Sequence, residues 1–168
     1  GHAEVFCAAG LNINVAVITI IGVGNGTNRP AFTWHTTDAK VTISAANVKL
    51  RNIQCLTDID AVVTMFLVSA AGVGFDAVDF VDTAACAPLQ FLLTTVAGDA
   101  LTIENCRHVQ TLSAAASVQA WIGLVGADRF TCRNNFFSLR GAATAAANGH
   151  IVGSGTQSAP VLIANNRF

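Results

Sequence analysis

The chain has 168 residues, of which 52% are hydrophobic and only 11% are charged, and its formal net charge is −1. This length fits a single domain, and the weak charge with scattered arginines argues against a nucleic-acid partner. Polar residues interrupt every apolar run before the roughly 18 residues that a membrane helix needs, so we expect no membrane partner. The surplus of apolar residues predicts an obligate homo-oligomer, because large exposed apolar patches normally form interfaces.

Residues 1–10 show no periodicity, and we expect them to form a lead-in or cap. From residue 11 onward a short alternating pattern recurs, and its clearest copy is Leu101-Thr102-Ile103-Glu104-Asn105-Cys106. Related copies begin at residues 18, 48, 73, 130 and 161, with steps of 25 to 31 residues. A second short apolar stretch precedes each copy, at residues 11–13, 41–43, 65–67, 91–93, 122–124 and 151–152.

Each repeat unit is therefore expected to hold two strands, followed by a longer variable segment. Examples of that segment are residues 25–30, 56–60, 82–88 and 140–144. A repeat of this length whose strand register returns one coil later is typical of a solenoid, whereas a sandwich would show strands every 8–12 residues. The sequence predicts an all-β fold, a right-handed parallel β-helix of about six coils over residues 11–168.

Asparagine follows the alternating stretch at the same place in four copies, namely at Asn52, Asn105, Asn134 and Asn165. Gly22 and Ala77 hold the corresponding place in the other two copies. Asn and Gly tolerate the left-handed backbone of a sharp bend, and stacked Asn side chains also form hydrogen-bonded ladders. We interpret these residues as a structural Asn ladder.

Charged residues occupy the fourth position of four consecutive copies, at Arg51, Asp76, Glu104 and Arg133. The alternation points these side chains outward on one sheet face. Asp76 and Glu104 would then lie about 5 Å apart on neighbouring strands, close to the carboxyl separation of a retaining glycosidase. An outward charge ladder is the favoured interpretation, and a catalytic pair is the weaker alternative.

The five cysteines are Cys7, Cys55, Cys86, Cys106 and Cys132. The odd number leaves at least one without a partner in the chain, and no Cys-x-x-Cys pair suggests zinc. Cys106 and Cys132 fall on core positions, where free cysteine packs as a small hydrophobe. We expect no metal and no cofactor, and an interchain disulfide stays open.

The histidines and tryptophans carry weaker signals. The histidines, which we expect at the surface or at its boundary, are His2, His35, His108 and His150. Trp34 and Trp121 are expected to anchor the core or a subunit interface, and a sugar-stacking platform is the alternative.

Several stretches carry a resemblance to a known family: Gly22–Pro30, Ala45–Ile53, Asp58–Val62 and Leu101–Cys106. With them the chain resembles the phage-encoded right-handed parallel β-helix proteins of the pectate-lyase-like superfamily, of the tailspike and virion-accessory type. The resemblance implies a non-enzymatic virion structural protein, commonly trimeric, that serves as capsid decoration, cement, spike or fibre segment among other virion proteins.

Some relatives of this fold cleave or bind polysaccharide, and fold alone does not fix function. A carbohydrate-active or host-glycan-binding tailspike module is therefore the alternative, with a host surface glycan as its partner. Capsid and tail locations, and the exact oligomer number, stay open at this point. The absence of an initiator methionine also leaves open whether the chain is processed or a fragment.

Overall fold

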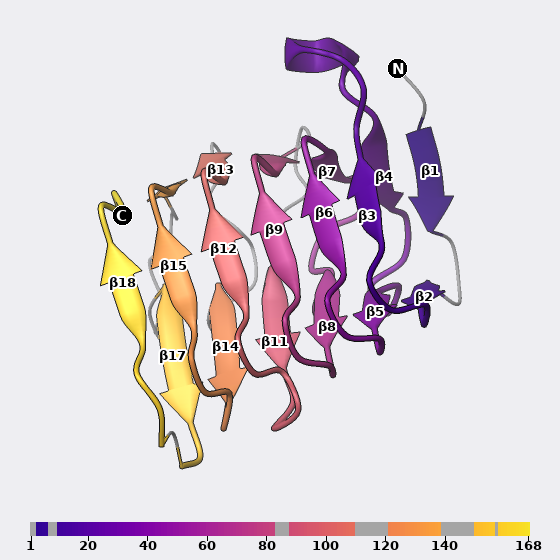
Figure 1. The fold of residues 1–168 in the computed structure, drawn as a ribbon. Helices are drawn as coiled ribbons and strands as arrows, with labels where there is room; N and C mark the ends of the chain where they lie inside the picture. The colour runs from indigo at the N-terminus through magenta and orange to yellow at the C-terminus, as the bar shows by residue number, and fades with distance from the viewer. Residues whose placement is uncertain (1–2, 7–9, 83–87, 110–120, 139–149, 157) are drawn as a thin grey trace.

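In a computed structural model the chain forms a parallel β-solenoid, in which strands from successive coils lie side by side (Figure 1). The structure describes residues 3–6, 10–82, 88–109, 121–138, 150–156 and 158–168. Three sheets, here called A, B and C, form the walls of the solenoid, and each contains six parallel strands. The one helical element among these residues is the short 3₁₀ turn η1 (Gly26–Asn28).

The three sheets alternate along the chain, so each coil passes through B, then C, then A. The strands of sheet A are β1 (Ala3–Phe6), β4 (Ala31–Trp34), β7 (Gln54–Thr57), β10 (Asp79–Asp82), β13 (Arg107–Val109) and β16 (Phe136–Ser138). Those of sheet B are β2 (Leu11–Ile13), β5 (Val41–Ile43), β8 (Phe66–Val68), β11 (Leu92–Thr94), β14 (Ile122–Val125) and β17 (Ile151–Ser154). Those of sheet C are β3 (Thr19–Ile21), β6 (Lys49–Arg51), β9 (Gly74–Asp76), β12 (Thr102–Glu104), β15 (Thr131–Arg133) and β18 (Leu162–Ala164).

The predicted fold class, an all-β parallel β-helix, is confirmed. The alternating stretches form sheet C, and the apolar stretches that precede them form sheet B. The prediction of two strands in each unit is wrong, because a third strand, on sheet A, follows every copy but the last. The expected number of about six coils is slightly too high, because the last coil has β17 and β18 but only an isolated bridge between Phe136 and Arg167 on sheet A.

Aromatic side chains form a continuous stack inside the solenoid. The Phe66 ring lies 5.0 Å from that of Phe75, 5.3 Å from that of Trp34 and 5.6 Å from that of Phe91, all edge to face. Such pairs stabilise a core by about 0.5–1.5 kcal/mol beyond their area burial. Trp34 and Trp121 are both buried, which confirms the core interpretation and rules out the sugar-stacking platform for these side chains.

The inner column of sheet A differs from the expectation at His108. It contains Phe32, Cys55, Phe80, His108 and Phe137 in register. His108 is only 1% exposed, and its ring stacks on Trp121 at 4.2 Å between centroids. The expectation of a surface or boundary position is therefore wrong for His108, because the third strand directs its side chain inward. His35 is exposed and His150 is half-buried.

Cys106 and Cys132 are buried in the core, as predicted, and both are free thiols. Burial raises the pKa of the Cys106 thiol to about 12 and that of Cys132 to about 11. Cys55 is buried as well, and burial raises its pKa too. Cys7, Cys86 and His2 lie outside the described residues.

Two corners of most coils use left-handed backbone. At the C–A corner, which joins sheet C to sheet A, φ is 53–58° at Asn52, Ala77, Asn105, Asn134 and Asn165. At the B–C corner, which joins sheet B to sheet C, the left-handed residues are Val17, Asn47, Gly72, Ala100 and Arg129. Gly22 does not have a positive φ. A Cβ atom there would instead collide with the Asn52 carbonyl oxygen of the next coil.

Candidate functional site

The outer face of sheet C carries two columns of side chains, because alternate residues of a strand point to the same side. In register, the first column is Thr19, Lys49, Gly74, Thr102, Thr131 and Leu162. The second is Ile21, Arg51, Asp76, Glu104, Arg133 and Ala164. The structure thus brings together the four residues of the expected charge ladder, and it adds Lys49, Gly74 and Thr102 beside them.

The four charged residues of the second column form two ion pairs between neighbouring strands. Arg51 Nε donates to Asp76 Oδ2 at 3.0 Å, and Arg133 Nε donates to Glu104 Oε1 at 2.9 Å. The arginine side chains are about half exposed, at 56% and 50%. Exposed pairs of this kind contribute at most about 1 kcal/mol each. The ladder therefore contributes little to stability, and it leaves the column with no net charge.

Two residues of the expected Asn ladder, Asn52 and Asn105, connect neighbouring coils beside this column, whereas the Asn134 and Asn165 side chains form no hydrogen bond within the described residues. Asn52 Nδ2 donates to the carbonyl oxygens of Gly22 and Gly24, at 2.8 and 3.0 Å. Asn105 Nδ2 donates to Asp76 Oδ1 at 2.8 Å. Asp76 is consequently held by one arginine and one asparagine, which leaves it fewer free lone pairs for a substrate.

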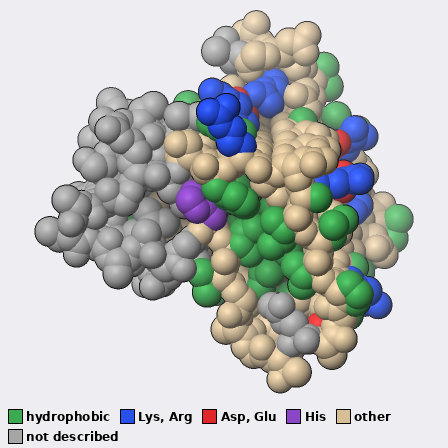
Figure 2. Space-filling view, turned by 90° about the vertical axis from the view of Figure 1, so that its left-hand side faces the viewer, with side chains coloured by type: hydrophobic (Ala, Val, Ile, Leu, Met, Phe, Trp, Pro, Cys, Tyr) green, Lys and Arg blue, Asp and Glu red, His purple; other side chains and the backbone are tan. Residues whose placement is uncertain are grey.

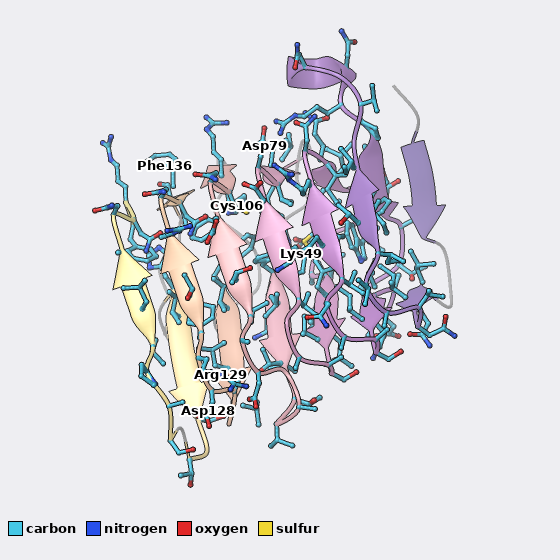
Figure 3. All side chains as sticks on the ribbon, viewed as in Figure 1. Lys49, Asp79, Cys106, Asp128, Arg129 and Phe136 are labelled. Atoms are coloured by element: carbon cyan, nitrogen blue, oxygen red, sulfur yellow. The ribbon has the colours of Figure 1, made fainter. Side chains whose placement is uncertain are left out.

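A shallow hollow opens in the middle of this face, where Gly74 has no side chain. Its volume is about 250 Å³, and its lining includes Lys49, Arg51, Thr102 and both carboxylates. A Cβ atom at Gly74 would lie 2.6 Å from Lys49 Cδ and 2.8 Å from Thr102 Oγ1, so the neighbouring side chains lean over the glycine. Figure 3 shows Lys49 at this place on the front of the stack. The sequence does signal Lys49, Gly74 and Thr102, since each lies two positions before a residue of the charge ladder.

The chemistry available in this hollow is limited. Lys49 forms no ion pair within the described part of the chain, so one cation remains free beside two neutralised carboxylates. Among the described residues, no group of three or more His, Cys, Asp or Glu side chains could hold a metal ion. The arrangement can hold a small polar group on an open surface, and it lacks the enclosed walls of a typical ligand cleft.

A third ion pair, which the sequence did not indicate, lies at the C–A corner. Arg29 Nη2 lies 2.6 Å from Asp79 Oδ2, and both side chains are only 15% exposed. Arg29 also donates to the carbonyl oxygen of Ala77 at 3.1 Å. The residues are 50 positions apart, so this pair fastens the segment around η1 across two later coils.

The outer face of sheet B has a different character. The outward column that runs through all six strands contains no charged residue and comprises Asn12, Thr42, Leu67, Leu93, Gly123 and Val152. A Cβ atom at Gly123 would lie 2.9 Å from Leu93 Cδ1, which shows that the leucine leans across the glycine. Leu67, Leu93 and Val152 are each partly exposed. Sheet B therefore presents an uncharged column with three apolar side chains, whereas sheet C presents charges.

No model of a protein family, no curated protein and no solved structure was found to match this chain. No helix among the described residues is long and apolar enough to cross a membrane.

Proposed function

We propose that this chain is a non-enzymatic structural protein in which copies of the β-helix associate side by side, with a trimer as the expected number. The observation that carries the proposal is the uncharged outer column of sheet B, with Leu67 and Leu93 on neighbouring strands. Sheets made only of parallel strands are normally covered on both faces. The same column on a second copy is a matching cover, since it is uncharged, carries Leu67 and Leu93 at its centre and has the same strand spacing.

The two ion pairs on sheet C also favour a structural role. They neutralise the only outward charges of their column without enclosing a cleft. Such a face stays solvated and suits the exterior of an assembly, because charged residues are depleted from the centres of interfaces. Sheet B would then face the oligomer axis, and sheet C would face outward.

The proposed place of the protein is a phage particle, as capsid decoration, cement, or a spike or fibre segment beside other virion proteins. This part of the proposal rests on the resemblance of the sequence to phage β-helix proteins. Immunogold labelling of purified particles, with an antibody against the chain, tests it. Labelling on the particle surface is expected, and particles that carry no trace of the chain would refute the virion assignment.

The lateral association is tested by the mass of the oligomer in solution. Light scattering coupled to gel filtration should give three times the chain mass at micromolar concentration. Leu93→Asp should reduce this to the monomer mass with an unchanged circular dichroism spectrum, because a carboxylate would be buried without a partner. Thr102→Asp, on the outer face of sheet C, is the matched control and should leave the oligomer intact. A monomeric wild-type chain would rule out the proposal.

A second candidate function is carbohydrate binding or cleavage, and the hollow beside Gly74 favours it. Two carboxylates of neighbouring strands, Asp76 and Glu104, line that hollow. Under this alternative, purified wild-type chain would shorten or bind a host surface polysaccharide. The double variant Asp76→Asn/Glu104→Gln would lose that activity while keeping its oligomer mass. Absence of both activities in the wild type, over a panel of host polysaccharides, would leave the structural role.

A further inference from the structure

A glycine inside strand β9 opens the middle of the outer face of sheet C. Gly74 does not have a positive φ, so its backbone conformation does not require glycine. Glycine in the interior of a strand weakens the strand, and it often marks a place where a ligand approaches closely. The glycine is therefore explained by the space above it, which is the hollow described above.

Two donor groups from the neighbouring strands flank this space. The position that a Cβ atom would take at Gly74 lies 2.7 Å from Lys49 Nζ and 2.8 Å from Thr102 Oγ1. Lys49 thus reaches from β6 across the glycine toward β12. Within the described part of the chain, neither the Lys49 ammonium group nor the Thr102 hydroxyl has a hydrogen-bond or ion-pair partner. Both groups can therefore donate to one anionic oxygen-bearing group.

The charges around the hollow leave one positive charge uncompensated. Three basic side chains lie in the hollow or on its rim, namely Lys49, Arg51 and Arg133. Two acidic side chains oppose them, namely Asp76 and Glu104. Both carboxylates are already engaged, since Asp76 accepts two hydrogen bonds and Glu104 accepts one from Arg133. Lys49 is consequently the charge that a bound anion would neutralise.

The basic side chains are also more exposed on this face than the acidic ones. Arg51 and Arg133 are 56% and 50% exposed, whereas Asp76 and Glu104 are 31% and 26% exposed. Figure 2 looks onto the C-terminal end of the solenoid, and sheet C lies along its right-hand side. More Lys and Arg surface than Asp and Glu surface is visible along that side. An anion that approaches from solvent therefore meets positive groups first.

From these observations we infer that the hollow over Gly74 binds one singly charged oxyanion group, a carboxylate or a sulfate ester. Lys49 supplies the charge, and the Thr102 hydroxyl and the Nη groups of Arg51 supply hydrogen bonds, since the ion pair of Arg51 uses Nε. A single surplus charge fits a monoanion better than a phosphate monoester, which carries about 1.5 to 2 negative charges at pH 7. The site does not depend on the lateral association, because it lies on sheet C.

Saturation-transfer NMR of the purified chain with glucuronate, acetate and glucose tests the site. Glucuronate and acetate should each give a signal that titrates to saturation, and glucose, which lacks the carboxylate, should give none. A lower dissociation constant for glucuronate than for acetate would support the site and identify a sugar acid as its ligand. Equal values would support it with the carboxylate alone as the recognised group. No glucuronate signal, or an equal glucose signal, would overturn the inference.

Lysine and glycine variants test which residues form the site. Lys49→Gln should raise the dissociation constant for glucuronate by about tenfold or more, because a charge-assisted hydrogen bond is lost. Gly74→Ala should also weaken binding, because its Cβ atom fills the space between the two donors. Lys40→Gln, at the other lysine of the chain, removes an exposed charge outside the hollow and should leave binding unchanged. If Gly74→Ala loses its circular dichroism spectrum, Thr102→Val replaces it. Unchanged binding in Lys49→Gln would overturn the inference.

The double variant Asp76→Asn/Glu104→Gln separates this site from the glycan alternative. It removes two negative charges that repel an anion and keeps Lys49, so glucuronate should bind more tightly, by roughly threefold for each charge removed. If the carboxylates themselves bound or cleaved a saccharide, the same variant would lose that activity. Weaker or unchanged glucuronate binding in the double variant would therefore overturn the anion site. Leu93→Asp should bind glucuronate as the wild type does, so this inference and the lateral association fail independently.

Discussion

The C–A and B–C corners both turn the chain through a residue with left-handed backbone, but they use different residue types. The C–A corner has asparagine in four coils, and Asn52 donates back to the preceding coil through its side chain. The B–C corner has the same backbone angle at Val17, Ala100 and Arg129. Figure 3 shows Arg129 and its neighbour Asp128 at this corner, away from Asp79 and Cys106 at the other.

The side chains that connect coils also point in opposite directions at the two corners. At the C–A corner, asparagine amides donate toward the N-terminal coil. At the B–C corner, aspartates accept from the C-terminal coil: Asp99 Oδ1 accepts from the Asp128 N–H at 3.0 Å, and Asp128 accepts from Ser158. The stacking of coils therefore imposes the bend, and side-chain hydrogen bonds determine how strongly each bend is stabilised.

The largest effect is expected at the C–A corner, for Asn52→Ala. The variant loses two hydrogen bonds, at about 1 kcal/mol each, and places alanine in a left-handed conformation that costs about 1–2 kcal/mol. The free energy of unfolding in urea should fall by about 3 kcal/mol in total. The unfolding midpoint, measured by circular dichroism, checks this value.

Asn134→Ala is the matched control for that experiment. Asn134 has a similar φ of 58°, but its side chain forms no hydrogen bond within the described part of the chain. Its replacement should cost only the conformational term, about 1 kcal/mol. Equal losses for the two variants would show that the cross-coil hydrogen bonds contribute nothing.

The sequence predicts much of this fold because every coil requires the same kinds of residue at the same positions. Sheet C and the C–A corner could be predicted, since core positions require apolar residues and asparagine tolerates the left-handed bend. A turn at the B–C corner could be predicted from small and polar residues such as Asn47 and Gly72, but its left-handed angle could not be predicted at Val17, Ala100 and Arg129, which have no preference for it. The sequence did not predict sheet A, because its inward-facing positions include polar side chains such as Thr57 and His108, which interrupt the alternation.

The site on sheet C could also be predicted only in part from the sequence. The charge ladder could be predicted from one repeating position, and its two ion pairs follow from strand register. The hollow beside Gly74 could not, because it depends on how the Lys49 and Thr102 side chains lean across a glycine on the strand between them. The Arg29–Asp79 pair joins residues 50 positions apart, so no local pattern reveals it.

At the B–C corner, Val17→Gly should stabilise the protein. A β-branched residue with φ of 60° is strained, and the side chain is 77% exposed, so little packing is lost. Relief of this strain stabilises the folded state, and the greater flexibility of glycine in the unfolded chain offsets part of the gain. The free energy of unfolding should therefore rise by about 1 kcal/mol. Val15→Gly, at an exposed neighbour without positive φ, should lower it instead. A loss of stability in Val17→Gly would contradict strain at this corner.

Ala77→Asn should give a smaller gain, at the one C–A corner where alanine has a left-handed φ, of 53°. Asparagine tolerates this conformation better than alanine, so thermal unfolding should shift upward by an amount that corresponds to at most about 1 kcal/mol, the conformational term that Asn134→Ala loses. Ala164→Asn, within strand β18, is the control and should not stabilise. No gain at position 77 would mean that the neighbouring coils already relieve the strain there.

The smallest effect concerns pH and the B–C corner at Asp128. Hydrogen bonds from the Ser158 hydroxyl and from the backbone N–H of Ser158 hold the pKa of the Asp128 carboxyl below its ordinary value of 3.8, against the opposing effect of desolvation. A lowered folded-state pKa means that the stabilisation is present above pH 3.8 and is lost as the pH falls through the folded value. At pH 6, hydrogen exchange of the Ser158 and Ala159 amides should be slower in the wild type than in Asp128→Asn. At about pH 2 the protonated carboxyl resembles the amide, so the difference should vanish. A difference that persists at low pH would show that the contact does not depend on the charge of Asp128. The Asp128 side chain would then act as a neutral hydrogen-bonding group, as the Asn52 amide does at the C–A corner.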